Sequence, residues 1–339
     1  MFTVPSPLKR TPIFALAALG LLLAACVPAA APAPTAAPKA SPLSATLVLD
    51  WFPNTNHVGV YVAQAKGWYA EQGLDLKIEP PSDPSAAMKL VGAGNAELGI
   101  SYQPTVTISR SQDVPVVSVA ALVQHNLGAF AAKKSSGISR PKDFEGKRYG
   151  SVALPQAKTQ LETVMRCDGA DPSKVETVTL GQQISQALLA DQVDFIAMLP
   201  TWEGIEVEMK GVELNYMPYR DYCLPDAYHL VYISSEATIR DKPEAIRRFL
   251  AATQRGYEYA VKNPSEAISI LLAAAPDLNP ELVRASEDRL APFFIAEAPH
   301  WGLQDADRWA KYSAWMYDNK LIQKPVDGAK AFTNDFLPK

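Results

Sequence analysis

Residues 46–67 read TLVLDWFPNTNHVGVYVAQAKG. Thr46 to Leu49 form a short β-type run, and Val58 to Lys66 fits a helix that a glycine ends. The next segment, Leu74–Ile78, alternates apolar and charged residues as a half-covered strand does. A strand, a loop, a helix and a second strand in this order are typical of α/β proteins.

The same order recurs in the second half of the chain. A predicted helix at 87–91 and strand at 96–100 correspond to a helix at 186–189 and a strand at 193–197. Each strand then runs into a loop with a proline, 101–105 in the first copy and 199–203 in the second. Further strands are predicted at 148–152 and 175–179, on either side of a helix at 158–167.

The repeat predicts an α/β protein with two lobes, mostly parallel sheets flanked by helices, and a ligand cleft between the lobes. Ligands of open α/β sheets bind beyond the carboxyl ends of the strands, where both proline-bearing loops lie. The chain is expected to cross between lobes near Leu122–Ala132 and near Tyr228–Ile233. The predicted boundaries are 45–127 plus 234–339 for lobe 1 and 128–233 for lobe 2.

The N-terminal residues predict export and a lipid anchor. Lys9 and Arg10 precede an apolar run, Ile13–Ala25, which is too short to span a bilayer as a helix and has the length of a signal-peptide core. The run ends in Leu-Ala-Ala-Cys, which resembles the bacterial lipobox, so residues 1–25 are read as a signal peptide and Cys26 as the lipidated residue. The alternative is an ordinary signal peptide with a chance cysteine. Residues 26–44, rich in proline and alanine, form an extended tether.

Composition narrows the function classes. The formal net charge is −4 and no basic run occurs, which argues against a nucleic-acid partner. The sequence has no second long apolar stretch, so no transmembrane domain is predicted. Cys167 and Cys223 have two readings: a disulfide in an oxidising compartment, or two buried free thiols.

Several spaced motifs resemble those of the family of thiamine-pyrimidine-precursor synthases and their binding-protein relatives. The motifs are DWFPNTNHVGVY at 50–61, AKGWY at 65–69, GLD at 73–75, GAGNAELG at 92–99 and FEGKRYG at 144–150. The resemblance covers essentially the whole body of the chain. It implies a two-lobed periplasmic-binding-protein fold of type II.

The family has an enzyme branch and a binding branch. In the enzymes, a lysine that holds pyridoxal phosphate and a sacrificial histidine would fall on Ser101 and Thr105, which can do neither task. The enzymes also carry a cysteine-dense iron motif, where this chain has only Cys223 in CLPDAYH (223–229). The resemblance therefore implies a receptor, and not an enzyme. Its ligand is predicted to be riboflavin, with a formylaminopyrimidine or hydroxymethylpyrimidine precursor of thiamine as the alternative.

Aromatic residues at strand ends and crossings are candidates for stacking on a flat ring. They are Trp51, Tyr61, Tyr102, Trp202 and Tyr228. Aromatic side chains also fill cores, and for Tyr61, on a predicted helix, that reading is equally acceptable. Tyr102 and Trp202 lie inside the two repeated loops and are the preferred ligand contacts.

Polar candidates could match the donors and acceptors of a heteroaromatic edge. They are Asn54, Asn56, Gln103, Gln124, Glu203 and Asp226. The ordinary alternatives are that the two asparagines shape a turn and that Glu203 is a solvated loop carboxylate.

The remaining expectations concern chemistry and partners. The four histidines are scattered without ligand spacing, and no phosphate-binding or nucleophile motif occurs, so no metal, cofactor or catalytic residue is expected. The predicted protein is a monomeric lipoprotein on the extracytoplasmic face of the cell membrane. It would capture riboflavin or a related aromatic vitamin and deliver it to the permease of an ABC transporter.

Overall fold

The computed structural model describes residues 42–83, 85–151, 156–180 and 184–339. The predicted signal peptide, Cys26 and nearly all of the tether lie outside the described residues. The last tether residues differ from expectation, because strand β1 already begins at Leu43. Within the described part of the chain, no helix has both the length and the apolarity that a membrane span requires.

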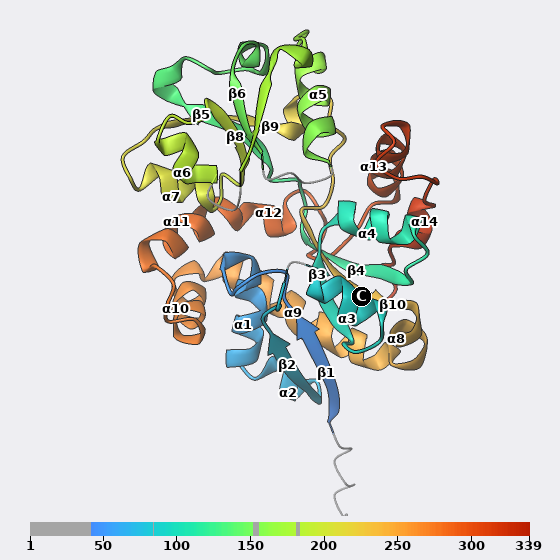
Figure 1. Ribbon diagram of the computed structural model, residues 1–339. Coiled ribbons are helices and arrows are strands. Elements are labelled where there is room, and N and C mark those ends of the chain that lie inside the picture. The colour runs from blue at the N-terminus through green and yellow to red at the C-terminus, as the bar shows by residue number, and fades with distance from the viewer. Residues whose placement is uncertain (1–41, 84, 152–155, 181–183) are drawn as a thin grey trace, which may run out of the picture. The chain divides into compact units, whose positions relative to one another are not determined.

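The first lobe is built on a five-stranded sheet with the order β2-β1-β3-β10-β4 (Figure 1). β1 pairs in parallel with β2 and β3, whereas β10 is antiparallel to β3 and β4. Four strands therefore point one way and β10 points the other. The strands are β1 (Leu43–Val48), β2 (Leu74–Glu79), β3 (Leu98–Ser101), β4 (Val116–Val123) and β10 (Leu230–Ser235).

The second lobe repeats this arrangement in the order β7-β6-β8-β5-β9. β6 is parallel to β7 and β8, and β5 is antiparallel to β8 and β9. The match between the two sheets confirms the predicted pair of mostly parallel α/β lobes. The strands are β5 (Ala129–Lys133), β6 (Arg148–Ser151), β7 (Glu176–Thr179), β8 (Phe195–Met198) and β9 (Leu214–Pro218).

Helices cover both faces of each sheet. Up to residue 208 the helices are α1 (Val58–Ala65), α2 (Trp68–Glu71), α3 (Ala86–Gly92), α4 (Gln103–Ser111), α5 (Ala157–Cys167), α6 (Ile184–Leu189) and α7 (Glu203–Glu208). The C-terminal part adds α8 (Glu236–Asp241), α9 (Pro243–Lys262), α10 (Pro264–Ala274), α11 (Pro280–Leu290), α12 (Pro292–Ile295), α13 (Ala306–Asp318) and α14 (Gly328–Ala331).

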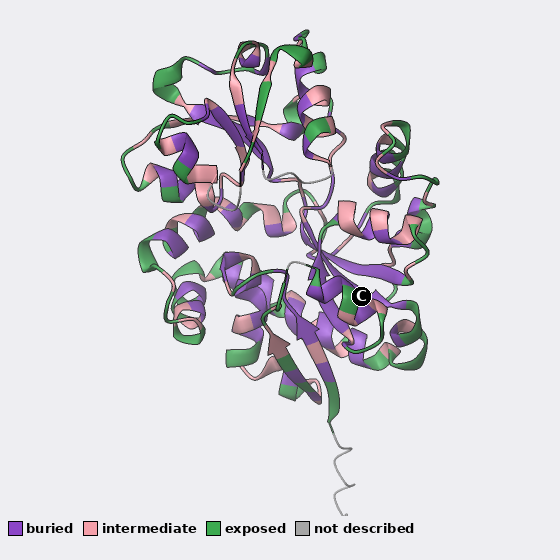
Figure 2. Cartoon of the chain, in the orientation of Figure 1, coloured by how far each residue is buried: buried purple, intermediate pink, exposed green. Residues whose placement is uncertain are grey.

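The strands alternate between two cores because successive side chains point to opposite faces. In β10, Leu230 and Tyr232 join the cluster formed with α1 and α9, whereas Val231 and Ile233 join the cluster formed with α3. β10 is buried along its whole length, as expected for a strand covered on both faces (Figure 2). The continuous apolar run of this strand is thus the sequence signature of a doubly covered sheet.

The pairing of β10 shifts one predicted boundary. The sequence placed the change from lobe 2 to lobe 1 at 233/234, but this point falls inside β10, a strand of the first sheet. The return crossing therefore lies before Leu230. The first crossing, between the end of β4 at Val123 and the start of β5 at Ala129, falls within the expected segment.

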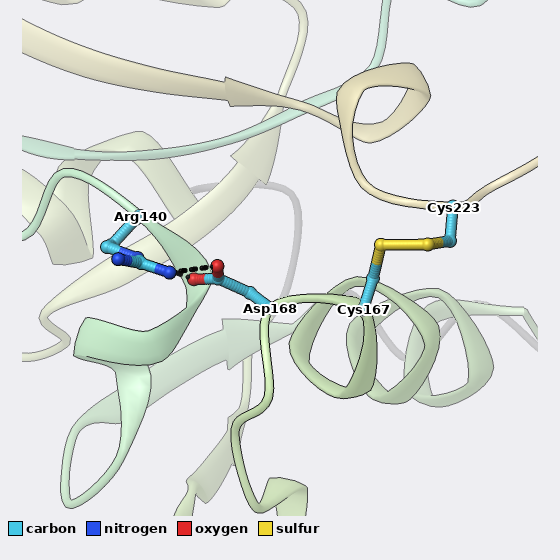
Figure 3. Close-up of a disulfide and its surroundings, with 4 residues drawn as sticks. All are labelled: Arg140, Cys167, Asp168 and Cys223. Atoms are coloured by element: carbon cyan, nitrogen blue, oxygen red, sulfur yellow. Dashed lines mark hydrogen bonds and ion pairs between the residues drawn. A yellow bond between two sulfur atoms is a disulfide. The ribbon is translucent and has the colours of Figure 1, made fainter.

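A disulfide joins Cys167, the last residue of α5, to Cys223 in the return crossing (Figure 3). Both cysteines are exposed, so the alternative of two buried free thiols is wrong. Beside the bond, Asp168 accepts from Nε of Arg140 at 2.8 Å. The two contacts fix the end of α5 against two separate loops.

Candidate functional site

The loop after β1 holds a buried aspartate and histidine. Nε2 of His57 lies 2.8 Å from Oδ1 of Asp50, and Nδ1 of His57 accepts from the backbone N–H of Asn54 at 3.2 Å. The hydrogen bond at Nδ1 places the ring proton on Nε2, which donates to the carboxylate. Burial opposes the ionisation of Asp50, but the hydrogen bonds from His57 and Tyr102 outweigh it and hold the pKa of Asp50 below its ordinary value.

Tyr102 and His229 extend this arrangement. The hydroxyl of Tyr102, at the junction of β3 and α4, donates to Oδ2 of Asp50 at 3.0 Å, while about a third of the residue remains exposed. Its ring meets the imidazole of His229 edge-on, with centroids 5.6 Å apart. Burial lowers the pKa of His229 to about 4, so its imidazole is neutral at physiological pH and offers one donor and one acceptor.

The second lobe contributes Trp202 and Glu203, which lie where β8 gives way to α7. The Trp202 ring is nearly buried and meets the ring of Phe52 at 6.0 Å, and Trp51 packs on Phe52 at 4.1 Å. Oε2 of Glu203 is buried without a hydrogen-bond partner among the described residues, and burial raises the pKa of this carboxyl. The charge of Glu203 also acts on Tyr102, so the two side chains lie near each other.

These residues form one group, called the site cluster below. It consists of Asp50, Trp51, Phe52, His57, Tyr102, Trp202, Glu203 and His229. Aromatic faces stand beside a neutral imidazole and a carboxyl oxygen that has no hydrogen-bond partner among the described residues. Such a set can stack on a flat ring and exchange hydrogen bonds with its edge.

Four sequence-predicted residues belong to the site cluster: Trp51, Tyr102, Trp202 and Glu203. Gln103 is adjacent and fully buried; its Oε1 accepts from the backbone N–H of Tyr228 at 2.8 Å, and its Nε2 has no partner among the described residues. The two asparagines follow the turn reading, because Oδ1 of Asn54 accepts from the backbone N–H of Asn56 at 2.8 Å.

The other predicted residues have partners elsewhere. Tyr61 packs against the main core, and Nε2 of Gln124 donates to the carbonyl of Leu303 at 3.1 Å. Oδ2 of Asp226 lies 2.7 Å from Nδ1 of His125. The hydroxyl of Tyr228 accepts from the backbone N–H of Asp305 at 2.5 Å. Gln124 and Tyr228 are at most 2% exposed, which leaves almost no surface for a ligand.

Sequence reasoning missed Asp50, His57 and His229 as functional candidates. The histidines look scattered because 172 positions separate His57 from His229, and the pairings of β1 with β3 and of β3 with β10 close that gap. The available signal was position, since Asp50 follows one strand end and His229 directly precedes β10. In the described part of the chain, no three histidine, cysteine, aspartate or glutamate side chains gather as a metal site.

Comparison with known proteins shows which family this chain resembles. Residues 54–267 match the family model described as NMT1/THI5 like. The chain is 31% identical over 295 residues to the formylaminopyrimidine-binding protein of Halalkalibacterium halodurans, an alignment that covers 85% of this chain and 89% of that relative. The 4-amino-5-hydroxymethyl-2-methylpyrimidine phosphate synthase of Legionella pneumophila is 30% identical, with 86% and 92% covered. The riboflavin-binding protein RibY of Chloroflexus aurantiacus is 28% identical, with 86% of each chain covered.

Solved structures share the fold at low sequence identity. The periplasmic aliphatic sulphonate-binding protein SsuA of Escherichia coli gives a TM-score of 0.70 at 14% identity, over 88% of this chain and 94% of that one. The CA3427 gene product of Candida albicans, described as having the generic periplasmic binding protein fold, gives 0.60 at 14% identity, over 88% and 98%. The predicted periplasmic-binding-protein fold is therefore confirmed. The family match and the relatives together show that the chain belongs to the NMT1/THI5-like family.

Proposed function

We propose that this protein is the substrate-binding receptor of an ABC importer, held on the extracytoplasmic face of the membrane by a lipid on Cys26. Its ligand is a small heteroaromatic vitamin or vitamin precursor, which it delivers to the permease. The family contains binding proteins for such compounds, and the two-lobed fold is that of importer receptors. The N-terminal apolar run ending in Cys26 agrees with export and anchoring.

A receptor role fits better than the synthase activity of other relatives. The position matched to the cofactor lysine is Ser101, a buried residue at the end of β3, and the position matched to the sacrificial histidine is Thr105 on α4. A serine hydroxyl forms no aldimine with pyridoxal phosphate, and threonine has no imidazole. Addition of pyridoxal phosphate is therefore expected to leave the absorbance spectrum without an aldimine band.

The site cluster favours an aminopyrimidine over riboflavin. Riboflavin needs wide aromatic walls, but two of the predicted aromatics, Tyr61 and Tyr228, are committed to packing. The observation that carries the choice is Oε2 of Glu203, which is buried and accepts no hydrogen bond from the part of the chain that the structure describes. An exocyclic amine of a pyrimidine would donate to this oxygen, and the ring would stack on Trp202 or Phe52. Riboflavin remains the second candidate, because the exposed Trp51 and Phe52 offer a further stacking surface.

Calorimetric titration with formylaminopyrimidine and with riboflavin tests both choices. We expect saturable one-to-one binding of the pyrimidine. Glu203→Gln keeps the shape of the side chain but removes one acceptor, and should weaken binding by about 1.5–3 kcal/mol, the range for a hydrogen bond to a charged group. Trp202→Ala should weaken it by about 1–3 kcal/mol through lost stacking and apolar burial.

Glu206→Gln is the matched control, because Glu206 lies on the same helix and is exposed. It should leave affinity unchanged. Heat from riboflavin alone would reverse the order of the two ligands. Heat from neither compound, with a fold that remains intact by circular dichroism, would overturn the proposed ligand class.

A further inference from the structure

Helix α11 of the first lobe contacts the second-lobe segment that carries Trp202 and leads into Glu203, the first residue of α7. α11 packs on α10 and on the loop after β1, and it also contacts α7 of the second lobe (Figure 1). Two of its side chains, Ser286 and Arg289, reach the backbone immediately before Trp202. The ligand-facing loop is therefore fixed by a helix that belongs to the other lobe.

Ser286 links both lobes through one hydroxyl. Its Oγ donates to the carbonyl of Thr201 at 2.6 Å and lies 2.7 Å from the hydroxyl of Thr55, in the loop after β1. Ser286, Thr55 and Thr201 are all buried. Since a buried carbonyl without a donor is unfavourable, the loss of this hydroxyl would penalise the present position of the loop.

Arg289 contacts the same loop one residue earlier, at Pro200. Its guanidinium donates to the carbonyl of Pro200 at 2.8 Å and to Oε2 of Glu208, on α7, at 2.8 Å. Glu208 is held in turn by the hydroxyl of Tyr216 at 2.7 Å. A charge-assisted pair of this kind is directional, so it sets the orientation of α7 as well as its distance from α11.

We propose that Ser286 and Arg289 form a latch that keeps the two lobes closed on the ligand and positions Trp202 and Glu203 for contact. They are positioning residues, since they touch the loop and α7 and do not belong to the site cluster. The proposal rests on the proposed receptor function for its consequence, although the latch itself is a property of the ligand-free protein.

The latch predicts a specific kinetic signature. Its bonds form only when the lobes are together, so they slow the opening that releases the ligand. Weakening them should raise the dissociation rate and leave the association rate nearly unchanged. It should also lower the population of the closed state, and the apparent affinity falls in proportion to that population.

The experiment compares Arg289→Ala with Arg284→Ala by stopped-flow binding of formylaminopyrimidine. Arg284 lies on the same helix and is exposed, which makes it the matched control. We expect Arg289→Ala to dissociate about tenfold faster, the loss of roughly one charge-assisted hydrogen bond, and Arg284→Ala to behave as the unmodified protein. Ser286→Ala should act in the same direction, and Ser286→Thr, which keeps the hydroxyl, should restore the slow rate. Equal rates in all variants would refute the latch.

A second measurement separates the latch from the choice of ligand. Labels introduced at Asp75→Cys on β2 and Glu176→Cys on β7, exposed positions on the outer strands of the two sheets, report the distance between lobes without any ligand. Arg289→Ala should lengthen or broaden this distance, and Arg284→Ala should not. A changed distance without binding of either ligand would keep the latch and overturn the receptor proposal. An unchanged distance would overturn the latch whatever the ligand.

Discussion

Glu287 is a carboxyl kept out of water on α11, next to Ser286. It is fully buried, and neither of its oxygens has a hydrogen-bond partner among the described residues. Burial raises its pKa to about 8, and the nearby charge of Asp288 adds to the effect. The side chain therefore carries a proton at neutral pH, and its ionisation would place an uncompensated charge in the core of the first lobe.

The sign of the resulting pH dependence follows from the raised pKa. The ordinary value is 4.5, so the folded protein holds this proton more tightly than the unfolded chain. The stability linked to Glu287 is fully present below pH 4.5 and is lost as the pH rises through about 8. The glutamine of Glu287→Gln does not ionise, so the variant does not lose this stability as the pH rises. Relative to the unmodified protein, the variant should gain up to about 1.4 kcal/mol for each pH unit between pH 6 and 8.

Urea denaturation at pH 6, 7, 8 and 9 measures the difference. Glu281→Gln, at an exposed position of the same helix, is the control and should track the unmodified protein at every pH. Parallel stability curves for Glu287→Gln and the unmodified protein would show that Glu287 does not hold its proton in the folded state.

At the residue scale, the sequence predicts those residues of the candidate site that lie in the repeated pattern. Tyr102 and Trp202 stand out because two copies of one helix–strand–loop pattern place them at equivalent strand ends. Asp50 and His229 have no such copy, and their proximity depends on the pairings of β1 with β3 and of β3 with β10. Asn54 was ambiguous because a capping amide and a ligand-binding amide look alike until the backbone donor that uses it is known.

At the level of elements, the disulfide fastens α5 to the return crossing. The bond closes a loop between positions 56 residues apart in the chain. Cys223 stands in a left-handed backbone conformation, with φ at 58°. α5 packs through Leu161, Val164 and Met165 on the core of the second lobe, so the bond ties the crossing to that core.

Removal of the bond should destabilise the second lobe. Disulfides typically stabilise a fold by about 2–4 kcal/mol, and the chain entropy that a loop of this length removes from the unfolded state lies near the upper end of that range. We expect Cys167→Ser combined with Cys223→Ser to lower the free energy of unfolding by that amount. Denaturation of the unmodified protein in dithiothreitol should reproduce the loss, and the double variant should not respond to dithiothreitol. A reductant effect of equal size on both proteins would assign the change to another cause.

The predicted elements agree with the structure where periodicity alone decides them. Leu74–Glu79 and Val58–Ala65 occur nearly as predicted, because an alternating strand and a glycine-ended helix are local patterns. The 233/234 boundary fails inside β10, since an apolar run does not reveal which sheet it joins. The cysteine pairing was open for the same reason: it depends on where α5 ends relative to a crossing that is distant in sequence.

At the scale of the whole molecule, the side chain of His125 contacts both the return crossing and the C-terminal part of the chain. His125 lies in the first crossing; its Nδ1 is 2.7 Å from Oδ2 of Asp226 in the second crossing, and its Nε2 is 2.7 Å from Oε2 of Glu297. Arg308 of α13 also faces this group, at 3.2 Å from Glu297 and 3.6 Å from Asp226. The imidazole of His125 thus connects the first crossing with the return crossing. Any relative movement of the lobes depends on these two segments.

The hydrogen bond that His125 donates to Asp226 raises the pKa of His125 above its ordinary value of 6.5, partial burial opposes the rise, and Glu297 adds to it. The stability that His125 contributes is therefore fully present below pH 6.5 and is lost as the pH rises through the raised value. His125→Gln retains hydrogen-bonding capacity but cannot take a charge. We expect the unmodified protein to lose more stability than this variant between pH 6 and pH 8.5.

Glu287 titrates in the same pH range, so the comparison belongs in a Glu287→Gln background, where the remaining slope is free of that carboxyl. His300→Gln provides the matched control, because the ring of His300 meets only the backbone carbonyl of Trp301 among its described hydrogen bonds. The free energy of unfolding of the His300→Gln variant should change with pH as that of the Glu287→Gln background protein does. If the free energy of unfolding of the His125→Gln variant also changes with pH as that of the background protein does, a charged imidazole at His125 does not stabilise the crossings. If the slopes differ as expected, protonation of His125 stabilises both crossings, and acidification should narrow the distribution of distances between the lobes that the labels on β2 and β7 report.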